Sequence, residues 1–387
     1  MRDVAIIGVG LTKFGERWSS GLKELMGEAG LAALEDANVT SHEVEMLYGG
    51  TMASGRFVGQ EHTAALMADQ LGFKNIPAVR IENACASGGS ALRQGYIAVS
   101  SGIHDIVVVG GVEKMTDVTA GEAATALGGA GDQEWELFQG ITFPGLYALM
   151  AKRHMHEYGT TEEQMASVAV KNHENAYRNE FAQFKKRISV DEVMRSKVIS
   201  DPIKLLDCSP ISDGAAVAVL APLEKARKYN DTPIKIIASS QASDTLRLAE
   251  RDSLTAIKAT SIAAQNAYGQ AKVTAKDIDV VEVHDCFTIA EIMAMEDLGF
   301  CKKGKAAKAI EDGETALNSG LSVNTSGGLK GCGHPVGATG VKQAAEVVWQ
   351  LRGEAKDRQV KGAEIGMTHN VGGSGATAVV HIYKRAD

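Results

Sequence analysis

The sequence has little of what marks a membrane, nucleic-acid-binding or disulfide-bonded protein. No run of about 18 apolar residues occurs, so no membrane-spanning helix is predicted. The net charge is −8 and basic residues do not gather with aromatics, which argues against binding to nucleic acid or an anionic membrane. The five cysteines are an odd number without a CxxC pair, so neither a disulfide framework nor a zinc site is predicted.

Proline is also scarce, with 7 residues, whereas glycine is abundant, with 42. This balance favours tight turns and close backbone packing over a disordered chain. Hydrophobic residues at 44% and charged residues at 23% are ordinary for a soluble globular protein. The first residues enter an apolar strand at once, without a signal-peptide pattern. We therefore expect a reduced, cytoplasmic protein whose cysteines are either inert or chemically active.

The segment from Val79 to Leu92 is the best single indication of function. Residues 77–81 suit a strand and the apolar positions after Ser87 suit a buried helix, so Cys85 is predicted at the turn between them. The helix N-terminus would favour a thiolate there. The small neighbours of Cys85 would let a ligand reach its sulfur. A buried structural cysteine is the alternative, and partners elsewhere in the chain must decide.

An internal repeat predicts two related halves. The segment Ala37–Glu45 aligns with Ala271–Asp279, with three identical and three conservative positions. In both copies an alanine-rich helix precedes the segment and an apolar strand follows it. We therefore predict two halves, 1–225 and 226–387, in which helices cover both faces of the sheets.

The first half is expected to contain an insertion. Core strands are predicted at 106–111 and 215–220, and the segment 113–206 between them is more polar and mostly helical. Thr161 and Gln164 match a capping box that opens a helix.

Two weaker motifs have simple structural explanations. His154 and His156 are separated by one residue, as in some metal sites, but their charged neighbours indicate a solvated helix face. The segment 8–10 (Gly-Val-Gly) is predicted as a turn after a strand, and a lone GxG is weak evidence for a dinucleotide.

Three constellations lie in the second half. Residues 280–287 place His284, Asp285 and Cys286 at the end of a buried strand, where active groups of α/β proteins collect. Residues 324–340 form a glycine-rich turn with Ser326 near the place that Cys85 takes in the first half; Cys332 and the Gly-His334-Pro sequence follow. Residues 367–375 form another such turn, with His369, Asn370 and Gly372.

Together these blocks resemble the thiolase family. The resemblance rests on segments 83–88 (Asn-Ala-Cys-Ala-Ser-Gly), 110–116 (Gly-Gly-Val-Glu-Lys-Met-Thr), 208–216 (Cys-Ser-Pro-Ile-Ser-Asp-Gly-Ala-Ala) and 333–340 (Gly-His-Pro-Val-Gly-Ala-Thr-Gly). The sequence His-Asp-Cys-Phe at 284–287, with Asn-Val-Gly at 370–372, is similar to sterol-carrier-protein-type and archaeal acetoacetyl-CoA thiolases. The resemblance implies an α/β thiolase fold with two pseudo-symmetric βαβαβαββ halves, layered α-β-α-β-α, and a helical insertion over the active site.

The resemblance also implies roles for the candidate residues. Bond formation between an acyl carbon and a thioester α-carbon needs a nucleophile, for which Cys85 is suited, and an acid/base, for which Cys286 is suited. His334 is expected to activate Cys85 and, with His284, to stabilise the enolate oxygen. Backbone N–H groups of Cys85 and Gly372 would form a second oxyanion hole. No role is assigned to Cys332, His369 or Asn370.

The activity implied is that of an acetyl-CoA C-acetyltransferase, which condenses two acetyl-CoA into acetoacetyl-CoA and CoA for isoprenoid (mevalonate) synthesis. No metal or redox cofactor is expected. The alternatives are degradative cleavage of longer 3-ketoacyl-CoA, a synthase that uses an acyl carrier protein, and a thiolase-shaped scaffold without turnover. The partners implied are a second copy or three further copies of the chain, hydroxymethylglutaryl-CoA synthase, and a small zinc-ribbon, OB-fold bridging protein.

Overall fold

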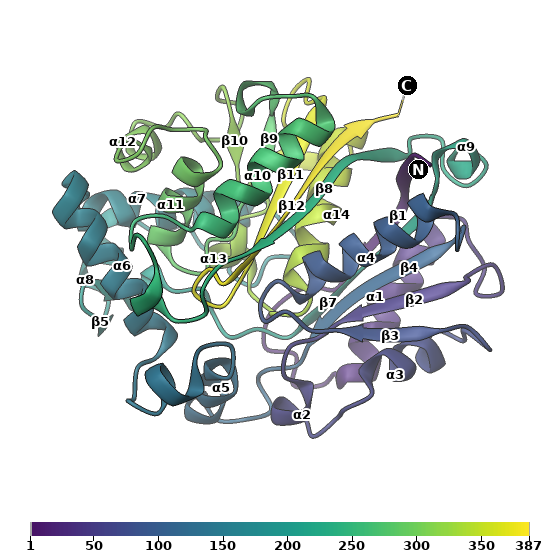
Figure 1. The fold of residues 1–387 in the computed structure, drawn as a ribbon, viewed down its shortest axis with the longest axis horizontal. Coiled ribbons are helices and arrows are strands. Elements are labelled where there is room, and N and C mark those ends of the chain that lie inside the picture. The colour runs from purple at the N-terminus through teal and green to yellow at the C-terminus, as the bar shows by residue number, and fades with distance from the viewer. Residues whose placement is uncertain (1, 387) are drawn as a thin grey trace.

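A computed structural model describes residues 2–386. The two halves of the chain follow the same order of elements, βαβαβαββ (Figure 1). The first half contains β1 (Val4–Leu11), α1 (Leu22–Asp36), β2 (Met46–Gly50), α3 (Thr63–Gln70), β3 (Ala78–Ile81), α4 (Ser87–Ser101), β4 (Val107–Glu113) and β7 (Gly214–Pro222). The second contains β8 (Ile234–Ser243), α10 (Lys258–Ala271), β9 (Val280–Glu282), α11 (Thr288–Asp297), β10 (Ser322–Val323), α14 (Thr339–Arg352), β11 (Ile365–Gly372) and β12 (Thr377–Arg385).

Short helices connect these elements. They are α2 (Ser54–Phe57), α9 (Leu223–Ala226), α12 (Ala306–Glu311) and α13 (Gly328–Cys332), with single 3₁₀ turns at Leu205–Asp207, Leu248–Glu250, Ala275–Asp277 and Lys356–Arg358. The predicted repeat is confirmed by the element order, because Ala37–Glu45 leads from α1 to β2 as Ala271–Asp279 leads from α10 to β9.

The strands form one mixed sheet in the order β10-β9-β11-β12-β8-β1-β7-β4-β2-β3. Each half supplies five neighbouring strands in the same relative order. The halves join where β1 pairs antiparallel with β8, with Val4 opposite Ile236 and Ile6 opposite Ile234. In each half the last two strands of the order, β2 with β3 and β9 with β10, are parallel. Loops after β3, β9 and β10 therefore leave the carboxyl ends of parallel strands.

The helices form three layers around this curved sheet. The helices α4 and α14 pack against each other and contact strands of both halves, so they lie between the two sets of strands. Helices α1 and α3 cover the outer face of the first set, and α10, with α11 beside it, covers the second (Figure 1). The expected α-β-α-β-α arrangement is thus confirmed. Because α14 is central, it is buried on nearly every side.

The predicted turn at 8–10 is wrong, since these residues continue strand β1. The glycines there serve close packing. A Cβ on Gly8 would lie 2.5 Å from the carbonyl oxygen of Ala33, and one on Gly10 would lie 2.1 Å from that of Ala29. Helix α1 can therefore lie directly on β1 only because both positions lack a side chain.

The segment between β4 and β7 is mostly helical, as predicted. It contains α5 (Ala120–Gly128), a π-helical turn (Gln133–Leu137), α6 (Phe143–Tyr158), α7 (Glu162–Tyr177), α8 (Val190–Arg195) and a hairpin of β5 (Val198–Ser200) and β6 (Ile203–Lys204). The predicted cap is present, because Thr161 Oγ1 accepts from the backbone N–H of Gln164 at 3.2 Å. Helix α7 packs on α11, α12 and α13, which fixes the insertion to the second half.

The predicted solvated face at His154 is wrong, although His156 is exposed. His154 is fully buried, with Nδ1 bonded to Thr160 Oγ1 at 2.8 Å and Nε2 to Glu296 at 3.2 Å. The charged neighbours lie on the other faces of α6, whereas His154 lies on the buried face and bonds Glu296 of α11. Within residues 2–386, no helix has the length and apolar character needed to cross a membrane.

Candidate active site

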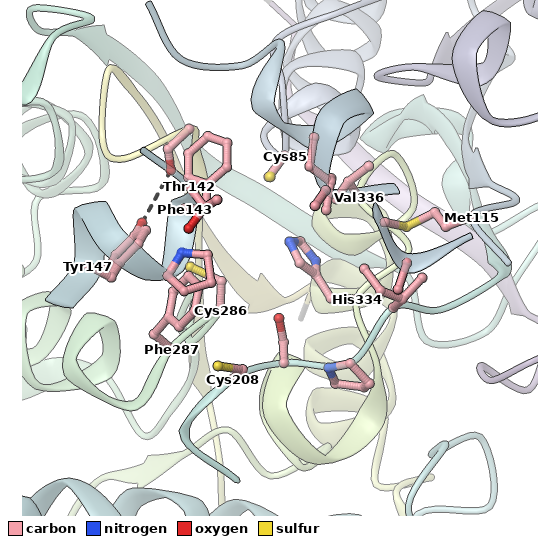
Figure 2. Close-up of a pocket in the computed structure, with 18 residues that line it drawn as sticks. Cys85, Met115, Thr142, Phe143, Tyr147, Cys208, Cys286, Phe287, His334 and Val336 are labelled. Carbon is pink, nitrogen blue, oxygen red and sulfur yellow. Dashed lines mark hydrogen bonds between the residues drawn. The ribbon is translucent and has the colours of Figure 1, made fainter. Parts of the chain in front are cut away.

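A cavity of about 180 Å³ lies where the loops from both halves meet beneath the insertion (Figure 2). Three predicted residues, Cys85, Cys286 and His334, line it. Figure 2 shows Tyr147 and Cys286 on one side and Cys85 and His334 on the other. His284 lies beside them, since ligand atoms of Cys85, His284 and His334 all fall within 4.8 Å of one another. The structure therefore brings the four predicted side chains together from loops far apart in the sequence.

The hydrogen bonds of His334 leave its Nε2 as a proton acceptor. Thr339 Oγ1 donates its own proton to the carbonyl of Pro335 at 3.0 Å, so it can only accept from His334 Nδ1, 2.7 Å away. Nδ1 therefore carries the proton and Nε2 keeps a lone pair. Burial lowers the pKa of His334 to about 3, so the ring is neutral at physiological pH. The free Nε2 lone pair can accept the Cys85 proton as the sulfur attacks, although burial makes the ring a weaker base than a free imidazole.

The hydrogen bonds of His284 give the opposite tautomer. Asn370 Nδ2 can only donate, and it lies 3.2 Å from His284 Nδ1, so Nδ1 accepts and Nε2 carries the proton. This Nε2 is buried and has no hydrogen-bond partner among residues 2–386. Burial lowers the pKa of His284 well below its usual value, and the nearby His334 lowers it further. An unused buried N–H is costly unless a ligand oxygen receives it, so His284 is arranged as an oxyanion donor.

Asn370 connects the nucleophile loop to His284. Besides His284, its Nδ2 donates to the carbonyl of Cys85 at 3.0 Å, and its Oδ1 accepts from the backbone N–H of Gly89 at 3.1 Å. No role for Asn370 followed from the sequence, although it begins the Asn-Val-Gly segment at 370–372 that is part of the family resemblance.

Cys85 lies directly before the start of α4, as predicted, but it is not a stabilised thiolate. Burial raises its pKa to about 12, and the backbone N–H of Gly373, which lies against the sulfur, offsets only part of this. The expected effect of the helix N-terminus is therefore outweighed by desolvation. Ala84, just before the cysteine, has a left-handed φ of 50°, a strained conformation for a residue with a Cβ.

Cys286 faces the same cavity from the β9–α11 loop. Burial raises its pKa strongly, while a hydrogen bond with the Tyr147 hydroxyl lowers it. Gly373 lines the cavity, whereas Gly372 packs on the nucleophile loop, where a Cβ would lie 2.7 Å from the carbonyl oxygen of Asn83. The predicted oxyanion role of Gly372 stays a prediction, with Gly373 as the neighbour whose N–H lies against the Cys85 sulfur.

Cys332 and Cys208 differ in their position relative to the cavity. Cys332 is buried away from the cavity lining, and its sulfur accepts from Asn179 Nδ2 at 3.6 Å. Cys208 does line the cavity, which the sequence did not indicate, and its thiol donates to the carbonyl of Lys204 at 3.3 Å. Neither His369, which bonds Thr260 through Nε2 at 2.9 Å, nor Cys332 is among the residues that line the cavity.

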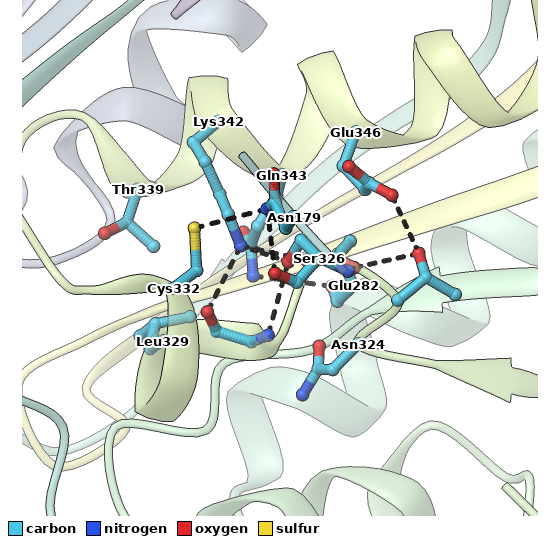
Figure 3. A network of polar contacts seen from close by, with 12 residues as sticks. Asn179, Glu282, Asn324, Ser326, Leu329, Cys332, Thr339, Lys342, Gln343 and Glu346 are labelled. Atoms are coloured by element: carbon cyan, nitrogen blue, oxygen red, sulfur yellow. Dashed lines mark hydrogen bonds and ion pairs between the residues drawn. The ribbon is translucent and has the colours of Figure 1, made fainter. Parts of the chain in front are cut away.

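Ser326 occupies the counterpart of the Cys85 position, since it follows β10 as Cys85 follows β3. Its surroundings are different. Ser326 Oγ is fully buried and bonds both Glu282 and Lys342, which pair with each other at 3.1 Å (Figure 3). This network ties the end of β9, which leads to His284, to α14, which begins at Thr339. The second half thus has the same strand-to-helix turn, but its Ser326 stabilises the fold instead of facing the cavity.

Two buried carboxylates, Glu113 and Asp213, lie in the segments 110–116 and 208–216 that carry the family resemblance. Asp213 accepts from Lys114 Nζ and from the backbone N–H of Met115, both at 2.7 Å. Glu113 accepts from the backbone N–H of Met52 at 2.9 Å and of Gly337 at 3.1 Å. Burial raises the pKa of Glu113 to about 7. Both carboxylates hold cavity loops in place.

Cys85, His284 and His334 are spaced closely enough to hold a metal ion. The donor set does not fit one well. A metal needs the lone pair of His284 Nε2, and moving the proton to Nδ1 would place two donors, Nδ1–H and the Asn370 amide, against each other. The arrangement instead offers a thiol, a base and an oxyanion donor.

Comparisons with known proteins agree with this chemistry. The family model "Thiolase, N-terminal domain" matches residues 4–224, and "Thiolase C-terminal domain-like" matches residues 240–385. An acetyl-CoA acetyltransferase of Methanothermobacter thermautotrophicus is 58% identical over the full length of both chains, and one of Methanocaldococcus jannaschii is 49% identical over 99% of each. Human sterol carrier protein 2 is 35% identical, with 99% of this chain matching 72% of that protein.

Solved structures give the same fold. The structure named "Ltp2-ChsH2(DUF35) aldolase" superposes with a TM-score of 0.85 at 28% identity, covering 98% of this chain and 97% of that one. The acetyl-CoA acetyltransferase of Syntrophomonas wolfei superposes with a TM-score of 0.77 at 18% identity, covering 99% of each chain. Together the two family models match nearly the whole sequence, and the chain belongs to the thiolase family.

Proposed function

We propose that this protein is an acetyl-CoA C-acetyltransferase, which condenses two acetyl-CoA into acetoacetyl-CoA and CoA through an acetyl group on Cys85. The observation that carries the proposal is the pair of opposite histidine tautomers beside Cys85: His334 Nε2 can accept a proton, and His284 Nε2–H can donate one. The two archaeal relatives with the same named activity support it.

In the first half-reaction His334 Nε2 accepts the proton of Cys85 as the sulfur attacks the thioester carbonyl. The C–S bond to CoA breaks, and the Cys286 thiol gives its proton to the leaving CoA thiolate. The products are acetyl-Cys85, free CoA, a protonated His334 and a Cys286 thiolate. Formation of this thiolate overcomes the high pKa of Cys286 because it is coupled to protonation of the leaving group.

In the second half-reaction the Cys286 thiolate removes an α-proton from the second acetyl-CoA. The enolate oxygen receives hydrogen bonds from His284 Nε2–H and from the protonated His334. The enolate carbon attacks acetyl-Cys85, and the oxyanion formed there would accept hydrogen bonds from backbone N–H groups of Cys85 and of Gly372 or Gly373. Collapse releases Cys85, which regains its proton from His334, so all groups return to their first state.

The test is the dependence of rate on acyl length. Thiolysis should be fastest with acetoacetyl-CoA and fall for 3-ketoacyl-CoA of increasing length to C16. The cavity of about 180 Å³ beneath the insertion supports this preference for short groups. Higher kcat/KM for long chains would instead support the degradative alternative, and no turnover with any chain length would support a scaffold.

We further propose that the protein works as a cytoplasmic homo-oligomer with other proteins. The outer edge of β3 has no strand partner among residues 2–386, and such an edge is suited to pairing with a second copy. A neighbouring fold that is named with a DUF35 partner supports a small partner protein here, for which a zinc-ribbon, OB-fold protein is the candidate. Condensation is uphill, so a consuming enzyme such as hydroxymethylglutaryl-CoA synthase, on the route to mevalonate, would draw off the product. Recovery of only the free homo-oligomer from native extract at low salt would count against these partners.

A further inference from the structure

Tyr147 of helix α6 projects from the insertion into the cavity that holds the two reactive cysteines (Figure 2). Only 1% of its surface is exposed. Its ring packs on Phe287, the residue after Cys286, with the ring centroids 4.6 Å apart. The hydroxyl donates to the backbone carbonyl of Gly373 at 3.2 Å. The packing of its ring therefore fixes Tyr147, and its hydroxyl lies between the Cys85 side and the Cys286 side of the cavity.

Each of these two sides holds one of the two sulfurs. The backbone N–H of Gly373 lies against the Cys85 sulfur, and the Gly373 carbonyl receives the Tyr147 proton. Cys286 lines the same cavity as Tyr147, and the Tyr147 hydroxyl lowers the pKa of its thiol. A hydroxyl has one proton, so it can donate to the Gly373 carbonyl or to the Cys286 sulfur, but not fully to both.

The protonation states favour Tyr147 as the donor to a thiolate. Burial raises the pKa of Tyr147 well above its usual value, and the charges of Cys286 and Cys85 raise it further, against a small lowering by Arg251. Burial also raises the pKa of Cys286, with the charges of Cys85 and Asp285 adding to it, but the hydrogen bond with Tyr147 lowers it. With its pKa held well above the usual value, the phenol keeps its proton at neutral pH and remains a donor beside a Cys286 thiolate.

We propose that Tyr147 is a positioning residue for the acid/base step, whose hydroxyl donates to the Gly373 carbonyl while Cys286 is a thiol and turns to the Cys286 sulfur when that becomes a thiolate. This inference rests on the proposed function, because it needs Cys286 to alternate between the two states. No atom is transferred to Tyr147; only its hydrogen bond changes partner. The insertion then contributes to the chemistry as well as covering it.

The test is Tyr147→Phe, which keeps the ring that packs on Phe287 and removes only the hydroxyl. The rate of α-proton exchange of acetyl-CoA with deuterated solvent should fall about 10–100-fold at neutral pH, because a hydrogen bond to a charged group is lost. The wild-type exchange rate should be regained only about one to two pH units higher. Acetyl-Cys85, followed by mass spectrometry, should still accumulate, because the leaving CoA thiolate can take its proton from water when Cys286 is a weaker acid, whereas removal of an α-proton needs the Cys286 thiolate. The loss should therefore be larger for exchange than for acetylation.

Tyr268→Phe is the matched control, because the hydroxyl of this half-buried residue also donates to a backbone carbonyl, that of Leu298 at 2.9 Å, and Tyr268 does not line the cavity. It should leave exchange unchanged. Replacement of Tyr147 by 3-fluorotyrosine keeps the fold even if Tyr147→Phe does not, and its stronger donor should move exchange to lower pH.

Three results would overturn the inference: unchanged exchange in Tyr147→Phe, an equal loss of exchange and of Cys85 acetylation, or no response to fluorination. Failure of the proposed function looks different. In that case the unaltered protein would show neither an acetyl group on Cys85 nor α-proton exchange.

Discussion

Replacement of Thr339 by Val should disable the base that activates Cys85 without changing the volume of the side chain. Thr339 Oγ1 is the acceptor that keeps the His334 proton on Nδ1, at 2.7 Å. In the variant that N–H is buried without a partner, at a cost of about 1–3 kcal/mol. The ring can avoid this cost by moving the proton to Nε2, which then faces Cys85 as a donor and cannot act as a base.

The population of the active tautomer should therefore fall about 5–150-fold, since each 1.4 kcal/mol is a factor of about ten. The assay is the rate of Cys85 acetylation by acetyl-CoA, measured by rapid quenching and mass spectrometry of the intact protein. Thr339→Ser retains the hydroxyl and is the control, with an expected rate close to that of the unaltered protein. If Thr339→Val acetylates as fast as Thr339→Ser while both melt at similar temperatures, the tautomer argument for His334 is refuted.

Three further predictions concern the other groups of the site. Cys286→Ser should still form acetyl-Cys85 but lose α-proton exchange. Cys332→Ser, outside the cavity lining, should keep most activity. If Cys332→Ser lost exchange and Cys286→Ser kept it, the acid/base would be Cys332. Because burial raises the pKa of Cys85 to about 12, its thiolate fraction rises tenfold per pH unit below that value. The rate of its alkylation by iodoacetamide should therefore keep rising through pH 10. A plateau of this rate below pH 8 would show a stable thiolate. Treatment with a chelator should leave condensation unchanged, and a loss that zinc restores would show that the Cys85, His284 and His334 cluster binds metal.

The features that could be predicted from the sequence are those that depend on local residue patterns. The strand-to-helix turn at Cys85 follows from apolar periodicity and small residues, and the repeat at Ala37 and Ala271 predicted the two halves. Errors arose where a distant element sets the environment. Gly8 and Gly10 continue a strand because they pair with β7, and His154 is buried because α11 covers one face of α6.

The same limit applies to the site. The reactive residues were found because their types and spacing resemble a family, but their protonation states depend on neighbours that spacing does not reveal. The base character of His334 depends on Thr339, five residues ahead, and the donor character of His284 depends on Asn370, 86 residues away. The prediction of a thiolate at Cys85 was wrong because burial of the sulfur raises its pKa. The sequence pattern reveals the helix that follows Cys85, but it does not reveal how deeply the sulfur is buried. Tyr147 was not found because nothing in its own helix marks it as facing two cysteines.

The central claim is that Cys85 carries the acyl group, and one measurement tests it most directly. The protein is mixed with acetyl-CoA labelled in the acetyl group, quenched within a single turnover, digested and analysed by mass spectrometry. The account predicts one acetyl group on the peptide that contains Cys85, which disappears on addition of CoA and is absent in Cys85→Ala. A label only on Cys208, Cys286 or another residue, with Cys85 unmodified, would contradict the account.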